Sequence, residues 1–305
     1  MTTPVDWRDI GYRTWPIAVI APDPDHPSRA LVLGGGGATG VAWLGGLAAG
    51  LRDLGVELRD ADTIVGTSAG SVAGAHLRLD DPETTADVSM ENFLNSERFT
   101  GLGRIGGHEA FNLIRGALHP NRGAGRRLVG MISTGAHTLA EEEFIRIVSR
   151  DLEGADWPEE SLLITAVDVR NGTPVVFHKD SGVPLQLAMA ASCAVPGVFP
   201  PITIGGRRYM DGGVRSVANV DLAAGHDRVL VLAPIPFSLG RRGNPSIQAR
   251  ELRDHSRTLT VVPDAATRRA VGLGVLDMHR TRPAYEAGFI QAERIVGRVE
   301  QLWTN

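Results

Sequence analysis

Ser68 stands between two glycines in residues 64–71 (IVGTSAGS), a run of the form G-x-S-x-G. β-branched residues precede the pattern and small residues follow it, so the sequence predicts a strand, a sharp turn and a helix. Only glycine tolerates the close packing at such a turn, here Gly66 and Gly70. Ser68 is therefore a candidate nucleophile, although this pattern also occurs in small-residue turns that have no reactive serine.

A glycine-rich run at residues 34–40 (GGGGATG) follows an apolar strand predicted at residues 30–33 and precedes a helix predicted at 41–54. Consecutive glycines allow several backbone amides to point at one oxygen, as an oxyanion hole requires. The free amides and the dipole at the start of the helix after the serine favour a negative charge in the same way. The candidate oxyanion donors are the amides of Gly35, Gly36, Gly37 and Ala69.

The same loop has a second interpretation, because Gly35 to Gly40 fits the G-x-G-x-x-G spacing of dinucleotide-binding proteins. Asp60 then falls about 20 residues further on, where such a site needs an acid for the ribose. Against this, the charged stretch around Asp60 makes a weak second strand, and the better strand at 63–65 leads into the serine turn. A phosphate-binding P-loop is excluded because Val41 stands where its lysine should be. A third interpretation is a loop that only packs a helix onto the sheet.

A serine nucleophile needs a general base. Nine histidines are available, and none has a persuasive sequence setting. Asp211 is the better candidate, because it ends a predicted strand and precedes Gly212 and Gly213, which present it on a tight turn toward an open cleft. With its ordinary pKa of about 3.9 an aspartate is a weak base, so this interpretation requires a buried environment. The alternative is an aspartate that only caps a turn.

The composition is that of a globular protein, with 305 residues of which 43% are apolar and 22% charged. The 31 basic and 35 acidic residues give a net charge of −4 and form no long run of one sign, so we expect no nucleic-acid partner. The single cysteine, Cys193, excludes an internal disulfide framework and a cysteine-based metal motif. We therefore expect neither a metal nor a cofactor, and a reducing compartment.

Residues 1–16 lack the basic start and the apolar run of a signal peptide. No run of about 18 apolar residues occurs, which a membrane-spanning helix would need. The sequence predicts a soluble, cytoplasmic protein that can still contact a membrane from outside, and it gives no indication of the oligomeric state.

Strands and helices alternate along the chain and predict a single α/β domain over residues 29–305, after an N-terminal extension at 1–28. Further strands are predicted at 63–65, 162–168, 175–178, 229–233 and 258–262, the second and third of these as a hairpin. Further helices are predicted at 70–79, 81–94, 110–118, 139–152, 185–192 and 286–302. The Gly- and Arg-rich region 95–139 is interpreted as a flexible flap over the cleft that meets lipid aggregates.

Four blocks resemble the patatin-like phospholipase family in content and order: residues 31–40 (LVLGGGGATG), 66–70 (GTSAG), 190–201 (AASCAVPGVFPP) and 211–213 (DGG). The resemblance covers roughly residues 30–221. It implies a three-layer α/β/α sandwich with a largely parallel sheet. It also implies lipid acyl hydrolysis through an acyl-enzyme intermediate, with Ser68 as nucleophile, Asp211 as base, no histidine, and the glycines at 35–37 as the oxyanion loop.

The sequence departs from the family pattern at Thr39, where the loop usually carries Arg or Lys before its last glycine. This departure favours a neutral acyl ester over a phospholipid as the substrate. Two other classes of function stay open at this point. They are a dinucleotide-binding protein that uses the loop, and a catalytically idle interaction module of the same fold.

Overall fold

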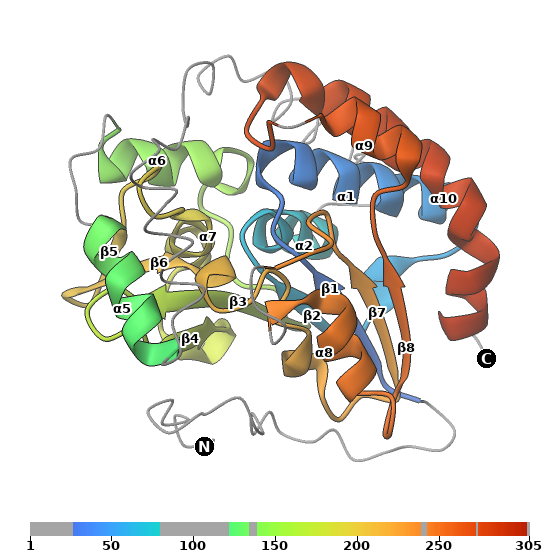
Figure 1. The fold of residues 1–305 in the computed structure, drawn as a ribbon, viewed down its shortest axis with the longest axis horizontal. Coiled ribbons are helices and arrows are strands. Elements are labelled where there is room, and N and C mark those ends of the chain that lie inside the picture. Colours follow the sequence, from blue (N-terminus) through green and yellow to red (C-terminus); the bar gives the residue numbers. More distant parts are fainter. Residues whose placement is uncertain (1–26, 80–121, 134–138, 239–242, 273, 304–305) are drawn as a thin grey trace.

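A mixed sheet of eight strands runs through the part of the chain that the computed structural model describes (Figure 1). The described residues are 27–79, 122–133, 139–238, 243–272 and 274–303. The strands lie in the order β5-β6-β3-β2-β1-β7-β8, and β4 pairs with β3. Their bounds are β1 (Arg29–Leu33), β2 (Thr63–Gly66), β3 (Ser161–Asp168), β4 (Pro174–Phe177), β5 (Ile202–Ile204), β6 (Arg207–Asp211), β7 (Arg228–Leu232) and β8 (Arg257–Val261).

Five neighbouring strands pair in parallel, in the order β3-β2-β1-β7-β8, whereas β4, β5 and β6 join the sheet in antiparallel pairings. Leu33 at the end of β1 is in register with Gly66 on β2 and with Leu232 on β7. The carboxyl ends of these three strands therefore meet at one edge of the sheet, which is where open α/β sheets bind ligands.

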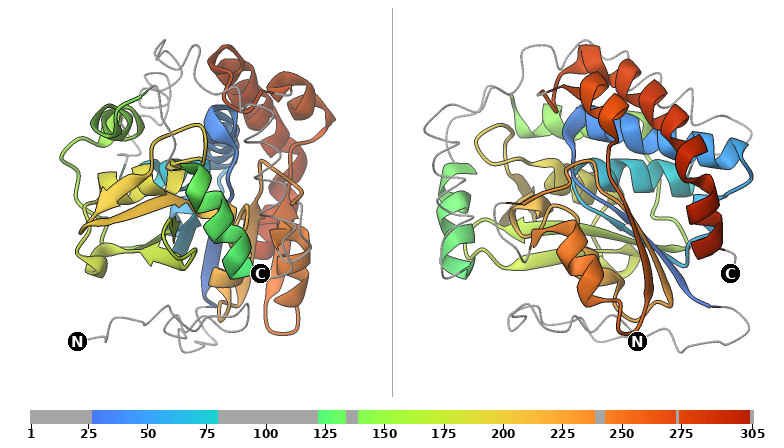
Figure 2. Two further views of the ribbon diagram at one scale, coloured as in Figure 1. Left: turned by 60° about the vertical axis from the view of Figure 1, so that its left-hand side comes forward. Right: turned by 45° about the vertical axis from the view of Figure 1, so that its right-hand side comes forward.

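Helices cover both faces of the sheet (Figures 1 and 2). Their bounds are α1 (Gly37–Asp53), α2 (Ala69–Leu79), α5 (Arg122–Ser133), α6 (Glu141–Val148), α7 (Leu185–Cys193), α8 (Pro245–Glu251), α9 (Ala265–Val271) and α10 (Thr281–Trp303). None of the helices in the described ranges combines the length and the apolar composition that crossing a bilayer requires.

Strand β1 shows why two layers of helices form. It is buried on both faces, because Leu31 and Leu33 pack in the core under α1, α2 and α10, whereas Ala30 and Val32 pack in the core on the side of α8. A strand that points apolar side chains to both faces of the sheet must be covered on both sides. The predicted three-layer α/β/α sandwich with a largely parallel sheet is confirmed.

Helices α1 and α10 approach each other so closely that only glycine fits at two of their contact positions. A Cβ atom at Gly46 would lie 2.1 Å from the Tyr285 carbonyl oxygen, and one at Gly288 would lie 2.5 Å from the Trp43 carbonyl oxygen. The Trp43 indole also donates a hydrogen bond to Gln291 on α10, at 3.0 Å. Helix α10 therefore holds α1, which begins at the glycine loop.

The predicted elements within the described ranges are present with shifted ends, and β3 and β4 form the predicted hairpin. The helix predicted at 41–54 begins earlier, at Gly37, and the one predicted at 286–302 begins at Thr281. The helix predicted at 139–152 ends at Val148, and a 3-10 turn follows it. The extension before residue 27 and the helices predicted at 81–94 and 110–118 lie outside the described residues.

Only part of the region predicted as a flexible flap is described, and residues 122–133 of it form helix α5. Val129 is buried against Val167 and Met210, and Arg127 donates a hydrogen bond to the Asn171 carbonyl in the β3–β4 turn. In its described portion the region forms a helix that packs on the sheet through Val129. The rest of the predicted flap lies outside the described residues.

Candidate active site

Ser68 lies on a sharp turn between β2 and α2, with a φ of +52° that few residues other than glycine adopt. The turn is fixed by hydrogen bonds that the Ser68 carbonyl accepts from the Ser71 amide, at 2.8 Å, and from the Ser71 hydroxyl, at 2.7 Å. Such backbone strain persists only where the surroundings impose it, and it is common at functional sites. The strand, turn and helix predicted around Ser68 are confirmed.

The two glycines beside Ser68 are required by close packing. A Cβ atom at Gly66 would lie 2.6 Å from the Ser71 Cα, and one at Gly70 would lie 1.9 Å from the Leu33 carbonyl oxygen. No side chain fits at either position, so helix α2 can start directly against the ends of β1 and β2.

Asp211 ends β6, next to β3 in the sheet, and its side chain is buried, with 5% exposed. Its Oδ1 accepts a hydrogen bond from the Gly213 amide at 2.6 Å, and the Ser68 side chain is near enough to lower the pKa of its carboxyl group by hydrogen bonding. Gly212 packs tightly, since a Cβ there would lie 2.2 Å from the Thr165 hydroxyl. The fold thus brings together the two side chains that the sequence analysis selected, although they are far apart in the chain.

Burial raises the pKa of Asp211 to about 6, and the hydrogen bonds from Gly213 and Ser68 oppose this rise. A carboxyl group of this kind is ionised at neutral pH and is a better base than a solvated aspartate. Cys193 lies close by, and burial together with the charge of Asp211 raises the pKa of its thiol. The Cys193 thiol is therefore uncharged at neutral pH, and it is part of the lining of the pocket that contains Ser68.

The amides of the glycine loop divide into two groups. Those of Gly34 and Gly35 donate to the Leu232 and Val217 carbonyls at 2.9 and 2.7 Å. Those of Gly36 and Gly37, at the start of α1, have no hydrogen-bond acceptor among the described residues, and the Ala69 amide at the start of α2 has none there either. Gly35 was predicted as an oxyanion donor, but its amide is already used, because the loop is anchored to the segment after β6.

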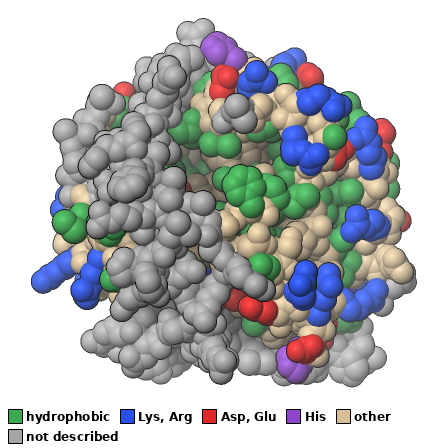
Figure 3. Space-filling view, in the orientation of Figure 1, with side chains coloured by type: hydrophobic (Ala, Val, Ile, Leu, Met, Phe, Trp, Pro, Cys, Tyr) green, Lys and Arg blue, Asp and Glu red, His purple; other side chains and the backbone are tan. Residues whose placement is uncertain are grey.

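Ser68 lines an apolar pocket of about 470 Å³, open solvent included. It is lined by Gly37, Ala38, Val41, Ser68, Ala69, Val72, Phe144, Val148, Cys193, Val195, Phe199 and Leu276. Phe144 and Phe199 stack in its wall, with ring centroids 4.5 Å apart. On the face shown in Figure 3, hydrophobic side chains gather near the middle and Lys and Arg lie mainly toward the right-hand edge. The described lining carries no charge, so it suits a hydrocarbon chain.

The sequence profile of the family described as patatin-like phospholipase matches residues 31–224, which is more than half of the chain. The chain belongs to the patatin-like phospholipase family. The matched range contains Ser68, Asp211 and the glycine loop.

Curated relatives of this patatin-like chain include proteins of Mycobacterium tuberculosis and Mycobacterium bovis, each named an uncharacterized NTE family protein. Each is 27% identical over 266 residues, covering 84% of this chain and 63% of the relative. The chain therefore spans less than two thirds of the length of these relatives.

Solved structures with a similar course of the chain include VipD from Legionella pneumophila, with a TM-score of 0.39 and 14% identity over 91% of this chain and 68% of VipD. Another is ExoU in its complex with SpcU from Pseudomonas aeruginosa, with a TM-score of 0.40 and 19% identity over 92% of this chain and 52% of the matched one. The family assignment rests on the sequence profile.

Thr39, at the position where the patatin-like loop usually carries a basic residue, faces the protein interior. Its side chain is 1% exposed, and its amide and hydroxyl donate to the Val275 carbonyl at 3.1 and 3.3 Å. Thr39 therefore ties the start of α1 to the segment before α10, and it does not present a polar group to a ligand.

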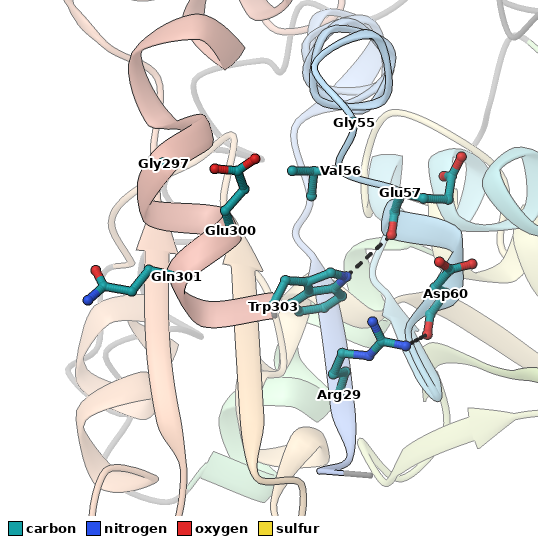
Figure 4. Close-up of a pocket in the computed structure, with 9 residues that line it drawn as sticks. All are labelled: Arg29, Gly55, Val56, Glu57, Asp60, Gly297, Glu300, Gln301 and Trp303. Carbon is teal, nitrogen blue, oxygen red and sulfur yellow. Dashed lines mark hydrogen bonds between the residues drawn. The ribbon is translucent and has the colours of Figure 1, made fainter. Parts of the chain in front are cut away.

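A second pocket lies near the start of β1, and Asp60 is part of its lining (Figure 4). Arg29 in this pocket stacks on Trp303 at 5.6 Å from the ring centroid and donates a hydrogen bond to the Asp60 carbonyl at 2.9 Å. The glycine loop follows the other end of β1. Asp60 and the loop therefore cannot bind one nucleotide, and the assignment of Asp60 as a ribose ligand is wrong. The local spacing was right, but the loop and the acid lie at opposite ends of the strand.

No described histidine lines the pocket at Ser68, whereas His26, His108, His119 and His137 lie outside the described residues. Within the described ranges no group of His, Cys, Asp and Glu side chains has an arrangement that could hold a metal ion.

One contact at the site was missed in the sequence analysis. The Ser192 hydroxyl, fully buried at the end of α7, accepts a hydrogen bond from the Ser68 amide. The signal that could have found it is the block at 190–201, which carries the family resemblance but was given no structural role.

Proposed function

We propose that this chain is a serine lipid acyl hydrolase with Ser68 as nucleophile and Asp211 as general base. The observation that carries the proposal is that the fold brings these two buried side chains together, with Ser68 in the lining of an apolar pocket. Membership of the patatin-like phospholipase family supports the same chemistry. The positive φ of Ser68 and its place before helix α2 support its role as the attacking group.

In the acylation step, Asp211 takes the proton of the Ser68 hydroxyl while Oγ attacks the ester carbonyl carbon. The carbonyl oxygen becomes an oxyanion, and the amides of Gly36, Gly37 and Ala69 are the proposed donors that stabilise it. The tetrahedral intermediate then collapses, the bond to the alcohol oxygen breaks, and Asp211 returns the proton to the leaving alkoxide. The product of this step is an acyl ester of Ser68.

In the deacylation step, Asp211 takes a proton from a water molecule, which attacks the acyl carbon of Ser68. The second tetrahedral intermediate releases the carboxylic acid, and the proton returns to Ser68. A pKa of about 6 leaves Asp211 ionised at neutral pH and still able to return its proton, as both half-reactions require.

For the substrate, we propose a neutral ester of an apolar acyl chain in preference to a phospholipid. The described pocket wall is apolar, and the loop position that is usually basic carries a buried threonine. A phosphate headgroup would find no cation among the residues that line the described part of this pocket.

A fluorophosphonate label tests the proposal, because it reacts only with an activated serine. We expect stoichiometric labelling of Ser68 in the wild type and none in Ser68→Ala or Asp211→Asn. Ser256→Ala is the matched control, since Ser256 is as buried as Ser68 but donates to the His226 carbonyl at the far edge of the sheet. A panel of neutral acyl esters and phospholipids then ranks the substrates.

Two results would contradict the proposal. A wild type that is neither labelled nor active on any ester in the panel indicates an idle module of the same fold. Labelling that survives in Asp211→Asn but is lost in a histidine variant places the base elsewhere.

A further inference from the structure

Asn219 is a fully buried residue, and its side chain touches both halves of the proposed active site. It follows Asp211 in sequence after the short 3-10 turn Gly212–Val214, and its φ is +51°. Its Nδ2 lies 3.0 Å from the Thr67 hydroxyl and 3.4 Å from the Gly212 carbonyl oxygen. Thr67 immediately precedes Ser68, and Gly212 immediately follows Asp211. One amide group therefore bridges the backbone segments that carry the two reacting side chains.

Two more contacts complete what we call the Asn219 network. The same Nδ2 lies 2.9 Å from the Ser216 carbonyl oxygen and 3.3 Å from the Thr165 hydroxyl. The Thr165 hydroxyl in turn donates to Thr67, at 3.0 Å. An amide nitrogen has only two hydrogens, so they are shared among these acceptors, with the shortest contacts to Ser216 and Thr67. The network joins β2, β3 and the turn after β6.

The orientation of the Asn219 amide is fixed by its neighbour Arg215. The guanidinium donates to Oδ1 of Asn219 at 2.6 Å and also to the carboxylate of Asp221. Since a guanidinium can only donate hydrogen bonds, Oδ1 must face Arg215, and Nδ2 must face Thr67 and Gly212. Gln248 donates to Asp221 at 3.0 Å and extends this support to α8.

We propose that Asn219 is a positioning residue that holds the turn of Ser68 and the turn of Asp211 at the separation needed for proton transfer. This inference rests on the proposed function of the dyad. It assigns Asn219 no contact with substrate, because the side chain is fully buried behind the two turns. Proton transfer depends steeply on the distance and alignment of the two groups, so a small displacement of either turn lowers the rate.

Two variants separate positioning from general structural support. Asn219→Asp keeps the shape but replaces the donor NH₂ with an oxygen, which cannot donate to the Ser216 and Gly212 carbonyls. Asn219→Gly removes the side chain and tolerates the positive φ at no steric cost. We expect both to lower kcat for a neutral ester at least tenfold while KM stays within twofold of the wild-type value.

Gln291→Glu is the matched control, because Gln291 is another buried amide with several partners. Its Oε1 accepts from Trp43 and Thr267, and its Nε2 donates to the Val262 carbonyl. None of these residues belongs to the Asn219 network or lines the pocket at Ser68. We expect Gln291→Glu to lower the free energy of unfolding as Asn219→Asp does, but to leave kcat within twofold of wild type.

The inference is overturned if both Asn219 variants fold and keep kcat within twofold of wild type, or if Gln291→Glu loses kcat to the same extent. Should Asn219→Asp fail to fold, Asn219→Gly decides. If the wild type itself hydrolyses no ester, the proposed function fails, and crystal structures of the Asn219 variants decide this inference separately. A distance between the Ser68 hydroxyl and the Asp211 carboxyl group that is unchanged in them overturns it, and a longer distance supports it.

Discussion

The amide of Ser68 donates a hydrogen bond to the hydroxyl of Ser192, at 2.9 Å, across 124 positions of sequence. Two residues later in the same segment, the Ala194 carbonyl accepts a hydrogen bond from the Asp211 amide, at 3.0 Å. The end of helix α7 therefore contacts the backbone of both proposed catalytic residues. This gives a physical reason why the block at 190–201 accompanies the serine and aspartate motifs in the sequence.

Ser192→Ala should destabilise the protein by about 1–3 kcal/mol, because it leaves the buried Ser68 amide without an acceptor. The strained turn of Ser68 should relax, so we also expect slower labelling by a fluorophosphonate. Urea unfolding and the labelling rate measure the two effects. Ser256→Ala serves again as the control and should label at the wild-type rate. Wild-type labelling in Ser192→Ala would show that this hydrogen bond is not needed to hold the nucleophile.

Hydrolysis should be lost in acid with a midpoint near pH 6. Asp211 must be ionised to accept the serine proton, and burial raises its pKa to about 6, so below that pH the carboxyl group is already protonated. We expect kcat/KM for a short-chain neutral ester to fall about tenfold for each pH unit below the midpoint. An unchanged rate down to pH 4.5, in a protein that is still folded, would argue against Asp211 as the base.

His226 should make folding stability depend on pH in the mildly acidic range. It is buried between the Thr63 hydroxyl and the Ala223 carbonyl, and burial lowers its pKa below the ordinary value of about 6.5. The unfolded chain then binds a proton at a higher pH than the folded protein. The contribution of His226 is therefore complete above about pH 6.5 and is lost as pH falls below it.

Urea unfolding of the wild type and of His226→Asn at pH 7.5, 6.5 and 5.5 isolates this contribution. Asp211 has the opposite effect in the same range, because its folded pKa is raised, but it is common to both proteins and cancels in the comparison. We expect the wild type to lose more stability than His226→Asn between pH 6.5 and 5.5. Parallel curves would contradict the prediction.

Phe144→Ala should enlarge the apolar pocket and shift the preference toward longer or bulkier acyl chains. Phe144 lines the pocket and stacks on Phe199, and the truncation should cost about 3–5 kcal/mol of stability. Phe177→Ala is the matched control, since Phe177 is also buried and packs edge-on against Tyr209 but does not line the pocket. Ratios of kcat/KM across a series of chain lengths should change in the first variant alone.

Local patterns were enough to predict much of the fold. The apolar run at residues 30–33 of β1 and the glycines around Ser68 determine short-range geometry, and both elements appear where the sequence placed them. The register of β1 and β2 then brings the glycine loop beside Ser68, as expected for neighbouring parallel strands.

Contacts between distant segments could not be predicted in the same way. Three hydrogen bonds depend on how segments far apart in the chain meet. They are the bonds from the Gly35 amide to the Val217 carbonyl, from the Ser68 amide to the Ser192 hydroxyl and from the Asn219 side chain to the Thr67 hydroxyl. Asp60 precedes β2 whereas the glycine loop follows β1, so the parallel pairing of these two strands places the acid and the loop at opposite ends of β1.

The residues that match the family profile do not include all the strands of the sheet. The match ends at residue 224, but β7 pairs with β1 along its whole length, and the Leu232 carbonyl holds the Gly34 amide. A fragment limited to residues 31–224 would leave β1 as a bare, apolar edge, which is a template for aggregation, and would remove α10 from the glycines of α1. Such a fragment would retain both members of the proposed dyad, yet we expect it to be insoluble.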